Sequence, residues 1–385
     1  MASTIIFWAT TGLIFYVFVG YPLLLWLVKL LFRRPVRKKA IEPSVSVLVA
    51  AYNEAVVIGD KIRNTLALDY PPERLEIVVA SDGSSDATAH IVRSLIAKGS
   101  KPLLRLLDYP HNRGKLAVLN DAVSQLSGEI VVFSDASSML ETAALRHLVA
   151  NFADPRVGAA SGVYKVLRKE DANLGAQEDI YWKYETFLKI QEAQLGALTG
   201  AHGSLYAMRR SLYPFPPPGT INDDFVIPTS VLRHKLRIAY EPSAVAYEEA
   251  EQMEGFGRRI RIAAGNVAQL REVKGLLWPP QPMVLFCFFS HKAARLLVPL
   301  AMVAAFVSNA LLLGPSLYQW LMVAQIAFYS LALAGAFIRL KPRILRLPYY
   351  FCKINASLFV WLYYLVSKRK GPPSSDGKRR SVVWT

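Results

Sequence analysis

The sequence predicts an α/β domain built on a mainly parallel sheet and flanked by membrane-spanning helices. Its composition combines two properties that are not expected together in one soluble domain. The 385 residues are 53% hydrophobic and yet carry a formal net charge of +16. Long uncharged runs lie toward both ends, and in the middle short apolar runs alternate with amphipathic stretches. The apolar ends therefore indicate a membrane, and the alternating middle indicates βαβ units.

The N-terminal membrane segment is the run of 24 residues at positions 5–28, which contains no charged residue. At about 1.5 Å per residue it can cross a hydrocarbon core of about 30 Å, so residues 1–32 are predicted to form a transmembrane helix. A signal peptide is the competing interpretation, but the run lacks a basic leader, is too long and is followed by no small-residue cleavage site. Lys and Arg collect on cytoplasmic flanks, so the basic cluster after the run predicts that the middle of the chain is cytoplasmic. The cluster comprises Arg33, Arg34, Arg37, Lys38 and Lys39.

Residues 43–278 are predicted to form the cytoplasmic α/β domain. Four short apolar runs in its first half have the composition of strands, and stretches with helical spacing separate them. Strands and helices that alternate in this way imply βαβ units and a mainly parallel sheet buried on both faces. The four runs are residues 44–52, 75–83, 103–107 and 130–133.

Acidic residues follow three of these strands at the point where each strand ends. They are Glu54 after the first, Asp82 at the end of the second and Asp135 after the fourth. In open α/β sheets, ligands bind beyond the carboxyl ends of the strands. Converging carboxylates repel one another unless they bind a cation or donors from a ligand, so a diphosphate with a divalent metal is the predicted partner. Lys115 opens a helix and is expected to face phosphate oxygens, although single features of this kind are also typical of ordinary turns and solvated helix starts.

The chain returns to the membrane after the α/β domain. Residues 279–295 are aromatic and apolar but too short to span, and they predict an interfacial helix. Residues 296–338 form a 43-residue uncharged run that Gly314-Pro315 interrupts, which predicts a hairpin of two transmembrane helices.

A further apolar segment at residues 347–366 is either a third C-terminal span or an interfacial helix. It contains Lys353, and basic residues lie on both sides of it, in the loop 339–346 and in the tail 367–385. A full crossing would put one of these clusters on the wrong side of the membrane, which favours the interfacial alternative.

Two other kinds of partner or site are not expected. The surplus positive charge lies next to the membrane segments, where anionic lipid headgroups are nearer than nucleic acid. The two cysteines, Cys287 and Cys352, lie in apolar sequence without metal or redox spacing. We therefore expect a lipid bilayer and no nucleic acid among the partners.

Seven motifs in this order resemble the family 2 glycosyltransferases, and specifically their membrane-embedded members such as the hyaluronan, chitin-oligosaccharide and cellulose synthases. The resemblance covers nearly the whole chain. The motifs are VLVAAYNE ending in Glu54, SDGSSDAT around Asp82, NRGKLAVLN around Lys115, FSDAS at Asp135, TGAHGSLYAMRR from Thr199, INDDFVIP at Asp223 and Asp224, and GRRIRIAAGN around Arg258 and Arg261.

The resemblance implies a GT-A fold and an inverting transfer from a nucleotide-sugar, with a UDP-sugar as the expected donor. Asp224 would be the general base, since an inverting transfer needs the acceptor hydroxyl deprotonated as it attacks the sugar. A Mg²⁺ or Mn²⁺ ion held by Asp135 would bridge the phosphates. The nucleotide-sugar residues implied are Ala51, Tyr52, Glu54, Asp82, Lys115, Asp135, Arg258 and Arg261, and those on the acceptor side are Gly200, His202, Gly203 and Asp223. The alternative for the Asp223-Asp224 pair is an acidic helix start capped by Asn222.

The chain departs from the family pattern in two places. Many relatives carry Asp-x-Asp where this chain has Asp135-Ala136-Ser137, so the second metal carboxylate is missing and Ser137 is a poor replacement. His202 is a candidate ligand in its place, with a structural hydrogen bond as the alternative.

The second departure is at residues 258–262, where processive polymerases show Gln-x-x-Arg-Trp. Arg258 and Arg261 lie three residues apart on one helical face and are expected to clamp the diphosphate. Ile262 stands in the place of the Trp, which puts processive polymerisation in question. A basic amphipathic helix at the membrane surface is the alternative for this run.

The predicted function is transfer of a sugar from a nucleotide-sugar to a growing polysaccharide at the inner membrane. Two alternatives stay open, transfer to a lipid acceptor and an inactive scaffold subunit that has lost the second metal carboxylate. The few predicted C-terminal spans would form only a narrow channel for a growing chain. A polymerase would therefore need to associate with further copies of itself or with an export subunit.

Overall fold

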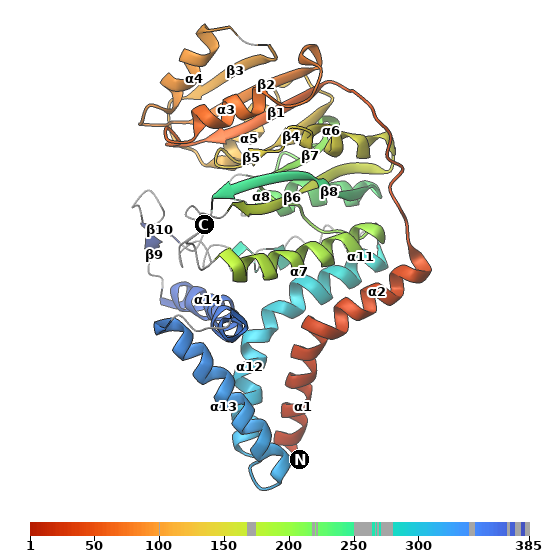
Figure 1. The fold of residues 1–385 in the computed structure, drawn as a ribbon, viewed down its shortest axis with the longest axis vertical. Coiled ribbons are helices and arrows are strands. Elements are labelled where there is room, and N and C mark those ends of the chain that lie inside the picture. The colour runs from red at the N-terminus through yellow and green to blue at the C-terminus, as the bar shows by residue number, and fades with distance from the viewer. Residues whose placement is uncertain are drawn as a thin grey trace.

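The computed structural model describes residues 1–99, 101–167, 175–217, 220, 222–249, 264–265, 267, 269–270, 280–338, 343–367, 370–373 and 379–381. Figure 1 shows a sheet with helices on both faces at one end of the molecule and a group of long helices at the other. Helix α7 (Gly175–Gln194) lies between the two parts.

The first four strands form the parallel half of an eight-stranded sheet, in the order β3-β2-β1-β4. Val45 at the start of β1 pairs with Leu75 of β2 on one side and with Ile130 of β4 on the other. The chain thus turns to one side of β1 for β2 and β3 and to the other side for β4, which leaves a ligand crevice at the carboxyl ends. These strands are β1 (Val45–Ala51), β2 (Leu75–Asp82), β3 (Leu103–Tyr109) and β4 (Ile130–Phe133), and they confirm the predicted α/β class.

The other half of the sheet is mixed and continues as β4-β7-β6-β8-β5. Strand β7 is antiparallel to β4 and β6, β8 is parallel to β6, and β5 is antiparallel to β8. The four strands are β5 (Met139–Leu140), β6 (Val157–Leu167), β7 (Tyr206–Arg209) and β8 (Arg237–Glu249). A separate two-stranded ribbon is formed by β9 (Lys370–Pro373) and β10 (Arg379–Ser381).

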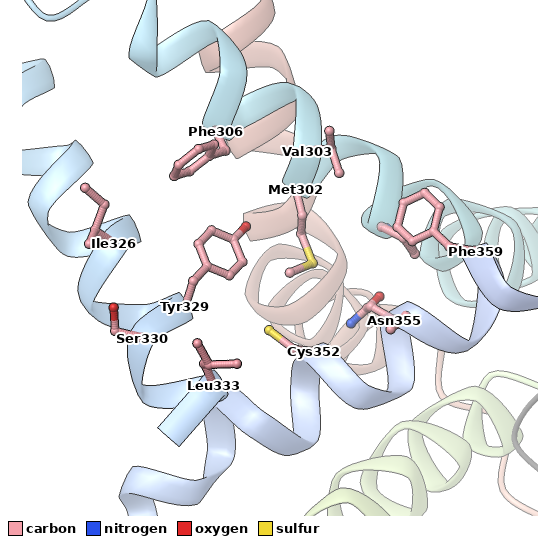
Figure 2. Close-up of a pocket in the computed structure, with 12 residues that line it drawn as sticks. Met302, Val303, Phe306, Ile326, Tyr329, Ser330, Leu333, Cys352, Asn355 and Phe359 are labelled. Atoms are coloured by element: carbon pink, nitrogen blue, oxygen red, sulfur yellow. The ribbon is translucent and has the colours of Figure 1, made fainter. Parts of the chain in front are cut away.

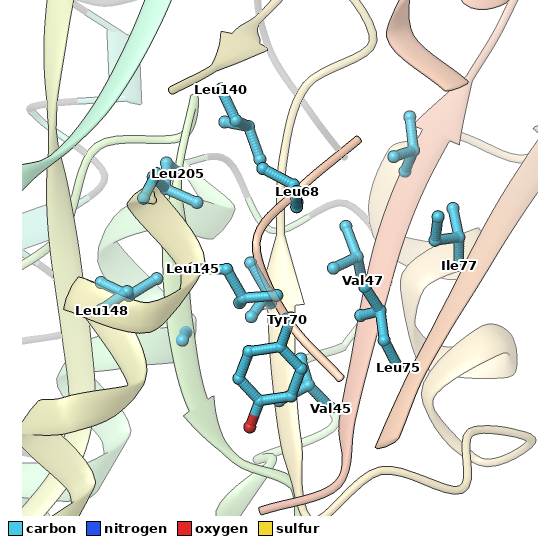
Figure 3. Close-up of a cluster of buried hydrophobic side chains, with 14 of the residues drawn as sticks. Val45, Val47, Leu68, Tyr70, Leu75, Ile77, Leu140, Leu145, Leu148 and Leu205 are labelled. Carbon is cyan, nitrogen blue, oxygen red and sulfur yellow. The ribbon is translucent and has the colours of Figure 1, made fainter. Parts of the chain in front are cut away.

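Helices cover both faces of the sheet, which is why the strands are continuous apolar runs. Val45 and Val47 of β1 belong to a core cluster with residues of α3, α4 and α6, part of which Figure 3 shows. Leu48 points to the opposite face and packs with Leu119 of α5. The helices are α3 (Ile58–Leu66), α4 (Thr88–Ala97) and α6 (Ala144–Val149) around the first cluster, and α5 (Lys115–Val123) and α8 (Asp223–Thr229) around the second.

Three described helices are long and apolar enough to cross a membrane: 2–32, 282–310 and 316–337. Helix α14 (Leu347–Ser367) is not among them. The first is α1 (Ala2–Phe15) and α2 (Tyr21–Phe32) joined by a π turn, the second is α11 (Pro282–Cys287) and α12 (Ala294–Ala310) joined by another, and the third is α13 (Ser316–Phe337). In Figure 1 each joined pair changes direction at its π turn. The predicted interfacial stretch and the first hairpin helix are therefore parts of one continuous helix rather than two separate ones.

The segment between α2 and β1 is bound to the sheet domain along its length. The N–H of Arg34 donates to the carbonyl oxygen of Gln194 at 2.6 Å, and the Lys38 ammonium lies 2.6 Å from a carboxylate oxygen of Glu241. On the side of the long helices, Leu188 of α7 packs in a buried cluster with residues of α2 and α11. Helix α7 thus connects the long helices to the domain that carries the predicted site.

Candidate active site

The loops that follow β1 and β2 are tied together by hydrogen bonds. Asn53 adopts a left-handed conformation with a φ of 56°, and its Oδ1 accepts a hydrogen bond of 2.8 Å from the N–H of Ser85. The N–H of Glu54 donates to Thr88 Oγ1 at 2.8 Å. These bonds hold the predicted nucleotide-binding segment 51–54 against the loop that begins at Asp82.

Asp82 is 3% exposed and fixes the approach to helix α5. Its two carboxylate oxygens accept hydrogen bonds of 2.8 Å from the N–H groups of Arg113 and Gly114. The next residue, Gly83, has a φ of 64°, and a side chain there would collide with the backbone of His111, so this close approach requires glycine. A carboxylate offers about four lone-pair sites, so these two hydrogen bonds leave Asp82 with further acceptor capacity.

Lys115 is the first residue of α5 and contacts two carboxylates. Its ammonium lies 2.9 Å from Asp135 Oδ1 and 3.0 Å from Asp223 Oδ2, and its side chain is 42% exposed. Loss of hydration lowers the pKa of Lys115, but the two negative charges outweigh this and raise it above its ordinary value. Lys115 therefore stays protonated and is available to phosphate oxygens at the rim.

Asp224 lies beside Asp223 in the first turn of α8, behind Asn222 in the N-cap position. Its backbone carbonyl accepts a hydrogen bond of 2.7 Å from the N–H of Ala201. Burial and the negative charge of Asp223 raise the pKa of the Asp224 carboxyl to about 6. A carboxyl with this pKa is ionised at neutral pH and yet more basic than an ordinary aspartate, as a general base should be. The pair therefore forms the acidic helix start, and this position is compatible with the catalytic role predicted for Asp224.

The predicted acceptor-side segment packs directly against these carboxylates. Gly203 lies next to both Asp135 and Asp224, because a β-carbon on it would stand 3.5 Å from Oδ2 of the former and 3.6 Å from Oδ2 of the latter. Gly200 has a φ of 89° and faces the start of α8 at Phe225.

The His202 side chain lies in a buried polar cluster with Lys189 and Tyr240. Its Nε2 lies 3.0 Å from the hydroxyl of Tyr240, and the ammonium of Lys189 lies within 3.5 Å of both ring nitrogens. Burial and the Lys189 charge hold the pKa of His202 well below its usual range, so the imidazole is neutral. The structure thus gives His202 a structural hydrogen bond, the alternative weighed for it above.

Sequence reasoning missed Lys61, which lies beneath the Asp135 turn. Its side chain is fully buried, and its ammonium donates to Ser134 Oγ at 2.6 Å and to the carbonyl oxygen of Ser138. Burial lowers the pKa of Lys61 to about 7, against the opposing effect of the Asp135 charge. Its helical position could have indicated this burial, because Lys61 lies on the buried face of helix α3 together with Ile58 and Thr65.

Glu248, near the end of β8, was also missed. It is 6% exposed, and its Oε1 accepts a hydrogen bond of 2.7 Å from Ser137 Oγ. Glu54 faces the same region, and burial together with the negative charges of Asp135, Asp86 and Glu248 raises its pKa. The rim beyond β1, β4 and β8 thus concentrates carboxylates.

This donor set fits a divalent cation that also binds phosphate. Carboxylate oxygens are the ligands that Mg²⁺ and Mn²⁺ prefer. Asp135 Oδ1 contacts Lys115, and the other oxygen, Oδ2, lies near Gly203. In the part of the chain that the structure describes, no three His, Cys, Asp or Glu residues are grouped to hold a metal alone. The predicted ligand Asp135 would hold such an ion only together with further oxygen ligands.

The structure thus brings one set of predicted residues close together and does not describe two others. The residues gathered at the rim are Ala51, Tyr52, Glu54, Asp82, Lys115, Asp135, Gly200, Gly203, Asp223 and Asp224. Arg258 and Arg261 lie outside the described residues.

A second feature is a cavity of about 600 Å³ between α12, α13 and α14. Figure 2 shows Met302, Tyr329 and Cys352 around it, one from each helix. Its lining is apolar except for a few groups such as the Tyr329 hydroxyl and the Asn355 amide. The cavity lies among the long helices and apart from the carboxylate rim.

Comparisons with known proteins agree with this geometry. Residues 46–214 match the model of the family described as Glycosyl transferase family 2. Over 229 residues the chain is 29% identical to the poly-beta-1,6-N-acetyl-D-glucosamine synthase of Staphylococcus aureus (strain COL) and 27% identical to that of Staphylococcus epidermidis. Each match covers 58% of this chain and 54% of the relative, so the chain spans about half the length of these curated relatives.

A solved structure is similar over almost the entire chain. It is the mannosyltransferase PcManGT from Pyrobaculum calidifontis in complex with GDP-Man and Mn²⁺, with a TM-score of 0.74 and 25% sequence identity. The similarity covers 94% of this chain and 99% of that one. It confirms the GT-A-like fold with its flanking long apolar helices.

Proposed function

The chain belongs to glycosyl transferase family 2, and we propose that it transfers a sugar from a nucleotide-sugar to a growing polysaccharide with inversion at the anomeric carbon. One observation carries this proposal. Lys115, Asp135 and Asp224 meet at the carboxyl ends of the strands, with a cation for phosphate, a carboxylate for a metal and a carboxylate with a pKa of about 6.

On the donor side, the proposed roles follow from charge. The diphosphate would take the place of carboxylate oxygens at the Lys115 ammonium, which is already protonated and oriented by Asp135 and Asp223. Asp135 would hold a Mg²⁺ or Mn²⁺ ion, which would offset the negative charge that builds up on the departing diphosphate. Segment 51–54 and Asp82 are proposed to bind the nucleobase.

On the acceptor side, Asp224 is the proposed general base. The acceptor hydroxyl oxygen attacks C1 of the sugar, the bond from C1 to the diphosphate oxygen breaks, and the hydroxyl proton passes to the Asp224 carboxylate. The products are the glycosylated acceptor and a nucleoside diphosphate. Gly203 supports this assignment, because it lies next to both Asp135 and Asp224 and adds no side chain there.

The polysaccharide acceptor is supported by the relatives, which are named poly-beta-1,6-N-acetyl-D-glucosamine synthases. The UDP-sugar donor is proposed from the resemblance of the sequence motifs. The three long apolar helices support a location in the inner membrane. The basic segment 33–39 supports an orientation with the catalytic domain on the cytoplasmic side.

A lipid acceptor is the second candidate, and the cavity between α12, α13 and α14 is the observation that favours it. An apolar space of about 600 Å³ among these helices suits the hydrocarbon chain of a lipid-linked acceptor. A polymer would instead need a wider passage, built with a second copy of the chain or an export subunit.

Nucleotide release by the full-length protein in lipid nanodiscs tests both candidates. We would supply a panel of UDP-sugars and GDP-sugars with Mn²⁺ or EDTA, and compare the wild type with Asp224→Asn. Release that requires metal and is lost in the variant would support the transferase. Sizing and organic extraction of the radiolabelled product would then separate polymer from glycolipid. No release with any donor, even with bacterial lipid extract present, would overturn the proposal in favour of an inactive scaffold.

A further inference from the structure

We propose that Glu248 supplies the second carboxylate of the metal and diphosphate site, in place of the acidic residue that Ser137 replaces in this chain. The inference rests on the proposed function, since it concerns a metal that would act together with a nucleotide-sugar. It adds a residue that the motifs do not include, because Glu248 lies 111 residues after Ser137.

The hydrogen bond between these two residues carries the argument. Ser137 Oγ donates to Glu248 Oε1 at 2.7 Å, so the Glu248 carboxylate lies where the side chain of residue 137 ends. An aspartate at position 137 would present its own carboxylate to this region. In this chain, Ser137 contributes no carboxylate, but the Glu248 carboxylate that is hydrogen-bonded to it occupies the same region and comes from a different strand.

Strand pairing holds Glu248 at this position. Strand β5 follows the Asp135 turn directly and runs antiparallel to β8, with Met139 opposite Tyr247 and Leu140 opposite Ala246. On its other side, Glu248 pairs with Val166 of β6. Because both neighbours are fixed by the sheet, the location of Glu248 is set by backbone register and its side chain is oriented by the Ser137 hydroxyl.

The charge balance at the rim favours a cation next to Glu248. Within the described part of the chain, no Lys or Arg forms an ion pair with Glu248 or Glu54, while Lys115 is already shared between Asp135 and Asp223. The negative charges of Asp135 and Glu248 contribute to the raised pKa of Glu54, after burial as the larger cause. Buried carboxylates without a cation are costly, and a divalent ion would offset that cost.

Two carboxylates suffice for an ion that the donor brings with it. Mg²⁺ is usually held by one or two carboxylates, with substrate phosphates and water as the remaining ligands. Since no three candidate ligands are grouped within the described residues, we expect weak metal binding by the protein alone and much tighter binding with a nucleoside diphosphate. Linkage then requires the metal to tighten nucleotide binding by the same factor.

The test measures Mn²⁺ binding directly, so that it does not depend on turnover. Full-length protein in nanodiscs would be titrated with Mn²⁺ in the presence of UDP or GDP, and free Mn²⁺ would be followed by electron paramagnetic resonance. We expect Glu248→Gln to weaken Mn²⁺ binding by about ten- to a hundredfold. Gln keeps the shape and can still accept the Ser137 hydrogen bond, so this change should leave the fold intact.

Two further variants make the test specific. The double variant Ser137→Asp with Glu248→Gln moves the carboxylate back to position 137 and is expected to restore most of the Mn²⁺ affinity. Glu241→Gln is the matched control, because Glu241 is a buried glutamate nearer the start of the same strand and pairs with Lys38. It should bind Mn²⁺ as the wild type does.

The outcomes separate this inference from the proposed function. If Glu248→Gln binds Mn²⁺ and nucleotide as the wild type does, Glu248 is not a ligand and the inference is overturned, while the proposed transferase stands. If Glu241→Gln weakens binding as much as Glu248→Gln does, the effect is structural and the inference is also overturned. If the wild type binds no Mn²⁺ with either nucleotide, the metal-dependent transferase itself fails.

Discussion

The ammonium of Lys115 lies 3.0 Å from Asp223 Oδ2 and so joins the first residue of helix α5 to the first residue of helix α8. The same ammonium lies 2.9 Å from Asp135 Oδ1 in the turn after β4. Three segments that are distant in sequence thus share one positive charge at the rim of the sheet. A diphosphate that binds there would replace carboxylate oxygens as the partner of the Lys115 ammonium.

Lys115→Met is therefore expected to weaken donor binding. A charge-assisted hydrogen bond contributes about 1.5–3 kcal/mol, which corresponds to a loss of about 10- to 100-fold in kcat/KM for the nucleotide-sugar. Arg113→Met is the control, because the Arg113 side chain points to Asp121 and is 44% exposed. Equal loss in the two variants would contradict a specific role of Lys115.

Asp224→Asn is expected to lower kcat by about 10²- to 10⁴-fold, the usual contribution of a general base. In the wild type, kcat should rise with pH through about 6, the pKa of the Asp224 carboxyl, and then level off. The measurement is kcat against pH at saturating donor. A flat profile between pH 5 and 7 would show that another group limits the reaction.

The same variant separates catalysis from folding. The pKa of Asp224 is raised from about 3.9 in the unfolded chain to about 6 in the folded protein. The folded state therefore binds more protons between these values, and the stabilisation by the protonated form is lost as the pH rises through about 6. We expect Asp224→Asn to have a Tm at pH 8 equal to or higher than that of the wild type, despite its lost activity. A lower Tm would point to a structural role.

The buried Lys61 predicts a pH dependence of stability in the opposite direction. Burial lowers its pKa from about 10.4 in the unfolded chain to about 7. Between these values the unfolded chain binds more protons, so the free energy of unfolding should rise with pH from about 7 to 10. Lys61→Met should remove that increase, as measured by Tm against pH in nanodiscs, whereas Lys98→Met, at an exposed position, should keep it. The same slope in all three proteins would contradict the prediction.

The parallel half of the fold was predictable because its strands are buried on both faces. Val45, Val47 and Leu48 face helices on opposite sides of the sheet, so the strand is a continuous apolar run that is visible in the sequence. The positions of Asp82, which ends β2, and of Asp135, which lies in the turn after β4, were predictable for the same reason. Local sequence was sufficient to predict the position of a residue wherever that residue lies at the end of a recognisable strand or helix.

The mixed half and two site residues were not predictable, because they depend on long-range pairing. Strand β7 is a short, ordinary segment, and its place between β4 and β6 follows only from the assembled sheet. Glu248 reaches Ser137 through the pairing of β5 with β8. Lys61 is a charged residue on an apolar helix face, and only the position of Ser134 shows what its ammonium contacts.

Tyr21→Phe is expected to destabilise the junction between the long helices and the α/β domain. The buried Tyr21 hydroxyl donates to Glu192 Oε1 of α7 at 2.7 Å, and His291 Nδ1 of the π turn after α11 lies 2.6 Å from the same oxygen. Three helices thus meet at one buried carboxylate, and removing a hydrogen bond to a charged group costs about 1.5–3 kcal/mol. Thermal unfolding in nanodiscs should show a lower Tm for Tyr21→Phe but not for Tyr363→Phe, whose side chain is 54% exposed on α14. If both variants unfold at the wild-type temperature, the carboxylate of Glu192 does not hold α2 to α7.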